Sequence, residues 1–529
     1  MRPDVWQPPV TLSAAEAGIV RRIRRAKLFV FLREHRHELF SDAFQQELAR
    51  LYKGTPVGQP PVPPAQLALA TILQAYTGVS DDEVIEATTM DRRWQLVLDC
   101  RDAEESPFSK GTLVAFRQRL IAHGMDRQLI ERTLEMARTS GAFGTSALRV
   151  ALDSSPLWGA GRVEDTYNLV GHALRKALGV IACQQGRGLA ELAAEAGAPV
   201  VGGPTSLKAA LDLDWDAPEQ RAQALAIVLQ AVEAVERWLE PQPAVAADPV
   251  VQASREAAKQ VVAQDVVHSA GEPAVLRHGV SRQRRISLED AQMRHGRKSR
   301  SQRIDGYKRH VVHDLDSGLV RAVGVTPANA PEASVTVDLQ DDLAAQDVQL
   351  TTLSELHIDR AYLSSAWVRE RPASLTICCK AWPVRNGNHF PKTAFVLDWE
   401  RQTLRCPNAV TLPFEPGGTL HFPRAVCAVC PLRERCTTSA HGRSVHIHPD
   451  ERLFHELRER QQTPAGRDKL RERTAVEHTL AHIGHWQGRR ARYRGQRKNL
   501  FDLRRSAVVH NLHVLARLPA LAHHTKQAA

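Results

Sequence analysis

The chain has 529 residues, and its 70 Lys and Arg residues exceed its 59 Asp and Glu residues, giving a formal net charge of +11. With 43% hydrophobic and 24% charged residues, the composition is that of a globular protein and excludes a disordered or collagen-like chain. The length predicts about three domains. The sequence has no run of about 18 apolar residues and does not begin with a secretory signal pattern, so we expect a cytoplasmic protein without a membrane partner. The basic excess predicts a polyanionic partner, most often nucleic acid.

Charge is distributed unevenly along the chain. Residues 191–250 contain ten acidic and three basic side chains, whereas basic residues concentrate at 21–27, 282–309 and 489–505. Each basic stretch alone is compatible with a solvated helix face. Three of them around an acidic middle favour contacts with a polyanion.

The first part of the chain has the pattern of a helical domain. Apolar residues at helical spacing end near Gly78, and Ser80 with a Glu three residues later predicts a capping box that starts a second helix. Thr112 heads a third predicted helix, which carries Arg117 and Arg119 opposite its apolar side. This outline fits a helix-turn-helix reader of DNA and equally a small helical bundle.

Strand signals follow, and they alternate with helical stretches. A short apolar run at 148–152 leads directly into Asp153, and a second run at 353–358 leads into Asp359. Between them lie a long helical insertion and a predicted hairpin over residues 307–325. This order is typical of an α/β sheet, whose ligands bind at the carboxyl ends of the strands.

Asp153 and Asp359 are candidate metal ligands. If their strands are neighbours, the two carboxylates meet and repel each other unless a cation lies between them. Carboxylate oxygens suit Mg²⁺ or Mn²⁺. The simpler alternative for either residue is a turn or helix-capping aspartate.

A third carboxylate, Glu477, borders the apolar stripe of a predicted helix. Arg473 lies one turn earlier on the same face, where it can orient the carboxylate or contact a phosphate; the alternative is a plain salt bridge. Arginines then alternate with aromatic residues downstream, which suits backbone phosphates and stacked bases. The predicted DNA contacts are Arg473, Trp486, Arg489, Arg490, Arg492, Tyr493 and Arg494, together with Lys308 from the hairpin.

The order Asp153, Asp359 and Glu477, with an Arg four residues before the Glu, a helical N-terminal domain and an Asn-Leu-His tail at 511–513, resembles the DDE transposases of bacterial insertion sequences. The segments that include Asp305-Gly-Tyr and Val325-Thr-Pro are similar to core strands of one branch of that family. This branch places a cysteine-rich insertion before the helix of the catalytic Glu. The resemblance extends over roughly residues 20 to 520 and is specific through the order and spacing of its motifs.

The resemblance implies an α/β ribonuclease H-like core, a mixed sheet with helices, preceded by an all-α domain and interrupted by a helical and a Cys-rich insertion. The predicted segments are a helical DNA-binding or dimerisation domain at 1–140, core parts at 145–185, 282–375 and 468–520, an acidic helical insertion at 186–281, a Cys-rich insertion at 376–467 and a tail at 521–529.

Some positions depart from the family pattern, and they bear on activity more than on fold. Ser154-Ser155 follows the first Asp where Gly-Thr is more usual, and Arg360-Ala361-Tyr362 follows the second where a small Gly-Tyr step is common. Leu470 and Gly484 stand where related transposases have a Tyr and a Lys.

By the resemblance, Asp153, Asp359 and Glu477 hold two Mg²⁺ or Mn²⁺ ions and catalyse phosphoryl transfer at the ends of an insertion sequence. The expected partners are double-stranded DNA of the ends and of the target, and further copies of the chain in a homodimer or larger complex. The expected location is the bacterial cytoplasm, at the nucleoid. The alternatives are a DNA-binding regulator without catalysis and a stand-alone nuclease that cuts without joining.

Four of the eight cysteines fall in one window of the chain. A cytoplasmic protein has no need of disulfides, so clustered thiols favour a tetrahedral Zn²⁺ site that fastens a loop-rich segment. The alternative is a set of reduced thiols without metal. The four are Cys406, Cys427, Cys430 and Cys436.

Overall fold

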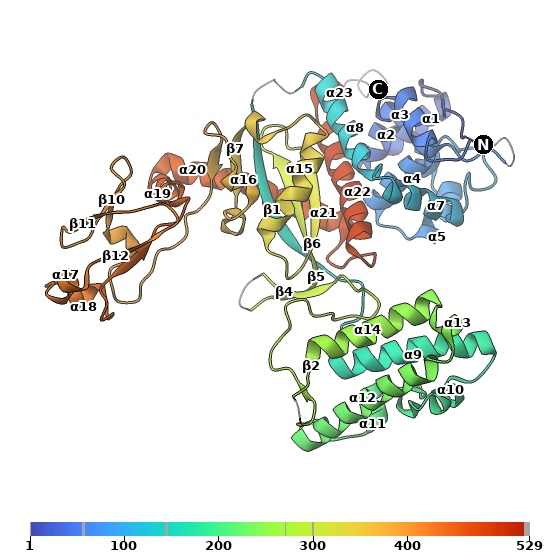
Figure 1. Cartoon of the computed structure of the whole chain (residues 1–529). Coiled ribbons are helices and arrows are strands. Elements are labelled where there is room, and N and C mark those ends of the chain that lie inside the picture. The colour runs from blue at the N-terminus through green and yellow to red at the C-terminus, as the bar shows by residue number, and fades with distance from the viewer. Residues whose placement is uncertain (1, 55–58, 143–146, 270, 299–300, 523–529) are drawn as a thin grey trace.

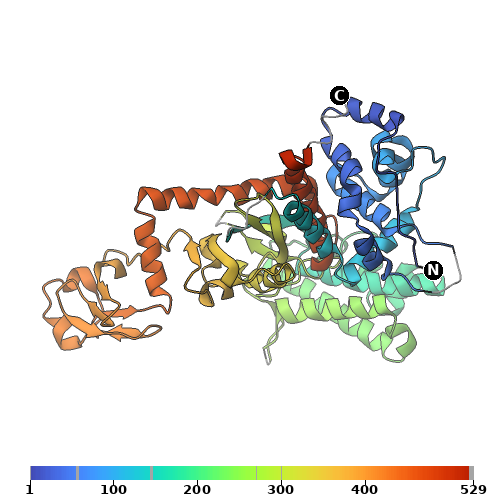
Figure 2. The ribbon, with the colours of Figure 1, turned by 90° about the horizontal axis from the view of Figure 1, so that it is seen from above.

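The computed structural model describes residues 2–54, 59–142, 147–269, 271–298 and 301–522. A central mixed sheet is covered by helices on both faces, and a helical N-terminal domain lies beside it (Figure 1). Two insertions project from this core on different sides (Figures 1 and 2). The fold is therefore the predicted α/β ribonuclease H-like core with an all-α N-terminal domain. None of the described helices is long and apolar enough to cross a membrane.

The N-terminal domain packs around one central helix, α4 (Pro64–Thr77), whose side chains from Pro64 to Ala75 are all buried. Gly78 ends α4 in the left-handed conformation with φ 77°, and Ser80 forms the predicted capping box at the start of the next helix. The other helices of the domain are α1 (Ala14–Arg22), α2 (Lys27–Leu39), α3 (Asp42–Ala49), α5 (Asp81–Met90), α6 (Arg92–Leu98), α7 (Lys110–Ala122) and α8 (Asp126–Thr139).

Helix α7 differs from the predicted third helix in its start and in the role of its arginines. It begins at Lys110 with Ser109 as N-cap, not at Thr112. Arg117 is buried in an ion pair with Asp81, and the guanidinium of Arg119 lies over a Tyr ring. Both arginines stabilise the bundle, so α7 does not present them as a DNA-reading helix would.

The core sheet has the order β4-β5-β1-β7-β8, with β6 paired to β5. Its strands are β1 (Leu148–Trp158), β4 (Arg294–Arg297), β5 (Arg303–Asp314), β6 (Val320–Pro327), β7 (Leu353–Ile358) and β8 (Thr376–Cys378). Strand β1 is antiparallel to β5 and parallel to β7, and β5 and β6 form the predicted hairpin. Strand β1 continues beyond the predicted end at residue 152, because its second half pairs with β5 as far as Trp158.

Strand alternation divides the sheet into two apolar faces. Ala151 and Val311 face a core that includes α21 (Thr474–Gln487), α22 (Gln496–Leu515) and the N-terminal domain. Leu152 and its neighbours face the opposite core, which includes α15 (Thr336–Ala344) and α16 (Ala366–Arg369). The short 3-10 helices are η1 (Pro199–Val201), η2 (Glu332–Val335), η3 (Leu350–Thr352), η4 (Arg360–Tyr362) and η5 (Lys392–Ala394), and α23 (Pro519–Ala522) follows α22.

The helical insertion has a hydrophobic core of its own. Its elements are α9 (Thr166–Gln185), α10 (Leu189–Glu195), α11 (Leu207–Leu211), α12 (Pro218–Leu239), α13 (Pro243–Ala246), α14 (Pro249–Asp265), β2 (Val266–Val267) and β3 (Val275–Leu276). The apolar side of α9 packs against α12 and α14 and not against the sheet. The predicted boundary at residue 185 therefore falls inside this unit, which begins with α9.

The Cys-rich insertion is built from short strands and helices around a small aromatic core. It contains β9 (Val396–Asp398), β10 (Thr403–Arg405), β11 (Thr411–Pro413), β12 (Thr419–His421), β13 (Ser444–His446), α17 (Arg424–Ala428) and α18 (Arg433–Cys436). Helices α19 (Glu451–Arg460) and α20 (Pro464–Glu472) then lead the chain back to α21 (Figure 1).

Candidate active site

Asp153 and Asp359 are brought together by the pairing of β1 with β7. The two strands are parallel with Leu152 opposite Ile358, and an aspartate follows each of these two residues: Asp153 within β1 and Asp359 directly after β7. This confirms that the two strands are neighbours. Burial raises the pKa of Asp153, and the charge of Asp359 raises it further, while Arg473 opposes the shift. Two clustered carboxylates thus lie at one point of the sheet.

Glu477 reaches the same place from α21. Val476, Leu480 and Ile483 are buried as the predicted stripe, which leaves Glu477 at the edge of the helix with a half-exposed side chain. Arg473 donates from Nη2 to Glu477 Oε1 at 2.7 Å and from Nη1 to Asp153 Oδ2. The salt bridge that was the alternative interpretation of this pair is therefore present, and Arg473 also pairs with Asp153.

A cleft of about 730 Å³ opens in front of these acids. Arg309 of β5 lines it, although sequence reasoning did not single out this residue, and its guanidinium donates to Ser155 Oγ at 2.7 Å and Gln487 Oε1 at 3.0 Å. Burial lowers the pKa of Arg309 to about 10. The cleft is lined by Asp153, Ser154, Ser155, Lys298, Arg309, Asp359, Arg473, Glu477, Leu480, Ala481, Gly484, His485 and Arg489.

Arg309 also lies against Gly484, where related transposases carry a Lys. A Cβ atom on Gly484 would be 3.0 Å from Arg309 Nη2, so the missing side chain leaves room for this guanidinium. The cleft consequently retains a basic group beside α21 despite the departure at 484.

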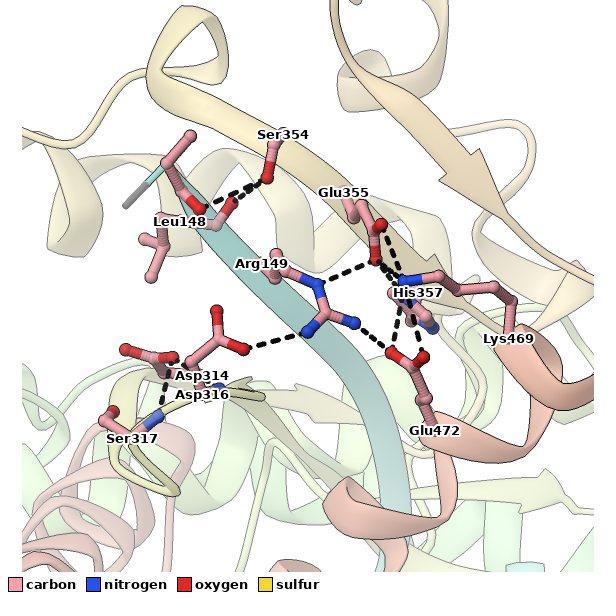
Figure 3. A network of polar contacts seen from close by, with 11 residues as sticks. Leu148, Arg149, Asp314, Asp316, Ser317, Ser354, Glu355, His357, Lys469 and Glu472 are labelled. Atoms are coloured by element: carbon pink, nitrogen blue, oxygen red, sulfur yellow. Dashed lines mark hydrogen bonds and ion pairs between the residues drawn. The ribbon is translucent and has the colours of Figure 1, made fainter. Parts of the chain in front are cut away.

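A network of charged side chains links β1, β7 and α20, the helix that precedes the helix of Glu477 (Figure 3). Arg149 of β1 donates from Nε to Glu355 Oε2 of β7 at 2.9 Å and also contacts Glu472 at the end of α20. Lys469 of α20 contacts both glutamates, at 2.8 Å and 3.3 Å. Arg149 and Glu355 each lie four residues before an aspartate of the site, on the same face of the sheet. This network therefore holds α20 and the start of α21 in register with both strands.

One part of this network has the spacing of a metal site. The ligand atoms of Glu355, His357 and Cys378 lie within 4.8 Å of one another. The carboxylate is already neutralised by Arg149 and Lys469, so we assign the group to the structural network. In the described part of the chain only this group meets that spacing, and the triad oxygens and the four clustered thiols lie further apart.

Most of the predicted DNA-binding arginines after Trp486 make contacts within the chain. Arg490 donates to Gly159 O at 3.1 Å, Arg492 to carbonyl oxygens of residues 78 and 79, and Arg494 pairs with a Glu at 2.8 Å. Of this group, Arg489 lines the cleft. The stretch thus fastens the loop after α21 to β1 and to the N-terminal domain.

The remaining predicted DNA contacts are also engaged within the protein. Trp486 stacks on His513 with ring centroids 5.3 Å apart, and Tyr493 lies edge-on to Phe501. Lys308 is 9% exposed, and its Nζ contacts Ala330 O and a Glu carboxylate instead of the cleft. The structure thus brings Arg473 and Arg489 to the acids and leaves Trp486, Tyr493 and Lys308 elsewhere.

The four clustered cysteines line one small cavity of about 30 Å³ in the Cys-rich insertion, together with Phe395 and Phe422. Burial raises the pKa of Cys436, and the charges of the other three thiolates would raise it further. Four thiols around one cavity are a donor set that suits Zn²⁺. The set comprises Cys406, Cys427, Cys430 and Cys436.

Three family models match the chain. A Transposase domain (DUF772) matches residues 23–119, and Transposase DDE domains match residues 274–374 and 415–516. The last two ranges contain Asp359 and Glu477. No curated protein and no solved structure matches the chain. DDE transposase domains catalyse phosphoryl transfer on DNA. With these three matches, the chain belongs to the DDE transposases of insertion sequences.

Proposed function

We propose that this chain cleaves the DNA ends of its insertion sequence and joins them to target DNA by metal-dependent phosphoryl transfer, with Asp153, Asp359 and Glu477 as its catalytic acids. The observation that carries the proposal is the meeting of two aspartates on paired parallel strands with a glutamate from the covering helix, beside an Arg-lined cleft. A regulator that only binds DNA has no need of this arrangement.

The three carboxylates fit Mg²⁺ or Mn²⁺ as a donor set, because all their ligand atoms are hard oxygens. The repulsion between Asp153 and Asp359, and the raised pKa of Asp153, favour a cation at this point. Bound divalent ions would supply activation of the attacking water or 3′-hydroxyl and stabilisation of the leaving oxygen.

The basic side chains of the cleft would hold the scissile strand. Arg309 is fixed by its contacts with Ser155 and Gln487, so it can meet a phosphate without reorganisation. Arg489 is exposed at the same cleft. Arg473 would orient Asp153 and Glu477. Positioning and electrostatics would thus carry the catalysis.

The N-terminal domain would recognise the ends or contribute dimer contacts. Five arginines surround a surface pocket of about 380 Å³ between the end of α1 and the start of α6. A group of this kind suits phosphates of a duplex. The arginines are Arg22, Arg24, Arg25, Arg92 and Arg93. We further propose a homodimer or larger complex, since two DNA ends must be brought together.

Product analysis separates this proposal from its alternatives. Purified protein, Mg²⁺ and a duplex carrying the terminal repeat that flanks the reading frame should give cleaved ends and joined products. A stand-alone nuclease would give cleavage without joining, and a regulator would bind without either. If Asp359→Ala or Glu477→Ala reacts as well as the wild type, the triad assignment is wrong.

A further inference from the structure

A second groove borders the predicted triad. It has a volume of about 510 Å³ and shares Asp359, Arg473 and Glu477 with the cleft of about 730 Å³. The cleft follows α21 beyond Glu477, toward His485, whereas the groove follows α20 and the start of α21 before Glu477. The two depressions therefore lie on opposite sides of Glu477 along these helices.

The second groove is strongly basic. Apart from the two acids of the triad, its lining contains no carboxylate, and its guanidinium and ammonium groups come from the η4 turn, the segment after β8 and helix α20. Arg471 pairs with Asp468, but both side chains are highly exposed, at 75% and 69%. An ion pair this exposed contributes little, so a phosphate can replace the carboxylate. The basic residues special to the groove are Arg360, Lys380, Arg467 and Arg471.

In-line phosphoryl transfer explains why the cleft and the groove should meet at the acids. In joining, the 3′-oxygen of the cleaved end forms a bond to a target phosphorus and loses its proton. The bond from that phosphorus to the 3′-oxygen of the target strand breaks, and this oxygen leaves with the electron pair and is protonated. The attacking and leaving oxygens lie on opposite sides of the phosphorus. The two DNA segments must therefore approach the acids from opposite sides.

We propose that the groove along α20 binds the target duplex while the cleft holds the transposon end; this rests on the proposed function. The loop after α21 that borders the cleft is bonded to the N-terminal domain through Arg492, which favours the end on that side. Arg467, Arg471 and Lys380 of the groove are exposed to solvent. Exposed Lys and Arg side chains suit contacts to backbone phosphates, which do not depend on the DNA sequence.

The test compares joining with cleavage in the full-length protein. The substrates are a duplex with the terminal repeat and a plasmid target, in Mg²⁺. The variant is Arg467→Gln with Arg471→Gln, and the matched control is Arg138→Gln with Arg452→Gln, two exposed helical arginines away from the site. We expect the ratio of joining to cleavage to fall roughly tenfold in the groove variant, because phosphate contacts to the target are lost, and to stay unchanged in the control.

Two results would overturn this assignment. An unchanged ratio with unchanged joining would show that the groove does not hold the target. Equal loss of cleavage and joining would show that the groove holds the end instead. A parallel reaction with Asp359→Asn distinguishes failure of the proposed function. If the proposed function is wrong, the wild type and Asp359→Asn will give the same products.

Discussion

The guanidinium group of Arg473 bridges Asp153 and Glu477, which lie 324 positions apart in the numbering, on β1 and α21. One side chain thus links the sheet to the covering helix. A cation at this point stabilises carboxylates that would otherwise repel each other. A divalent ion bound by the same acids would compete with Arg473 for their oxygens.

Replacing Arg473 should strengthen Mg²⁺ binding but lower the maximal cleavage rate. In Arg473→Gln we expect half-maximal cleavage at a lower Mg²⁺ concentration, because the competing cation is gone. At saturating Mg²⁺ the rate should fall by about 10²-fold, since a charge that orients two acids and faces the DNA is lost. Cleavage rates across a Mg²⁺ titration measure both effects, with Arg452→Gln as control. An unchanged half-saturation point would show that the bridge does not compete with metal.

The charged network of Arg149, Glu355, Lys469 and Glu472 should stabilise the core. Arg149→Met removes one of the two cations that Glu355 and Glu472 share and leaves only Lys469, so we expect the free energy of unfolding to fall by about 1–3 kcal/mol. Arg138→Met removes an exposed ion pair on α8 and should leave the free energy of unfolding nearly unchanged. Urea unfolding followed by circular dichroism compares the two. Equal losses would mean that the network adds nothing beyond a surface pair.

The same network predicts a pH dependence. Burial raises the pKa of Glu355, but the hydrogen bonds from His357, Lys469 and Arg149 outweigh it and lower the pKa from 4.5 to about 2. A carboxyl group with a depressed pKa in the folded state contributes stability that is complete above 4.5 and is lost as the pH falls toward 2. The destabilisation caused by Glu355→Gln should thus be equal at about pH 7 and pH 5.5 and shrink only below 4.5. Urea unfolding at each pH tests this, and a loss of the difference already between neutral and mildly acidic pH would contradict the depressed pKa.

Gly306 in β5 is required by a close backbone approach. Its φ is 152°, and an added Cβ atom would lie 2.2 Å from Gly159 N and 2.5 Å from Leu157 O. Gly306→Ala should therefore destabilise the fold by about 1–3 kcal/mol. Gly179 in α9 has nothing within 4 Å of its Cβ position, so Gly179→Ala should instead stabilise by about 0.5–1 kcal/mol. Thermal unfolding of both variants checks the contrast, which would fail if the two changes had the same sign.

The cysteine cavity should bind zinc. We expect about one zinc per chain in undenatured, reduced protein, and loss of that metal in Cys427→Ser with Cys430→Ser. Cys183→Ser, which changes an exposed thiol on α9, should retain it. Elemental analysis of the three proteins measures this. Zinc-free wild-type protein, or full zinc in the double variant, would show that the four thiols are not ligands.

The adjacency of the two aspartates could be predicted because each follows a short apolar run with a strand pattern, and parallel neighbouring strands bring such positions together. The pairing network could also have been found: Arg149 and Glu355 precede Asp153 and Asp359 by an even number of residues, which places them on the same face.

The contact partners of the arginines after Trp486 could not be predicted from the sequence. An alternation of Arg with aromatic residues suits a nucleic acid, but it suits carbonyl oxygens equally. Arg490 and Arg492 contact backbone oxygens more than 300 positions away in the sequence, at residues 159 and 78. Such partners depend on the completed fold. Likewise, the length of β1 follows from its pairing with β5 and not from its own composition.

The most direct test of the central claim is metal rescue of Asp359→Cys. Thiolates bind Mn²⁺ better than Mg²⁺, whereas carboxylates accept both. If Asp359 holds the catalytic metal, the variant should be inactive in end cleavage with Mg²⁺ and recover activity with Mn²⁺, while Asp359→Ala stays inactive in both. Cleavage by Asp359→Cys at the wild-type rate in Mg²⁺ would contradict the assignment of Asp359 as a metal ligand.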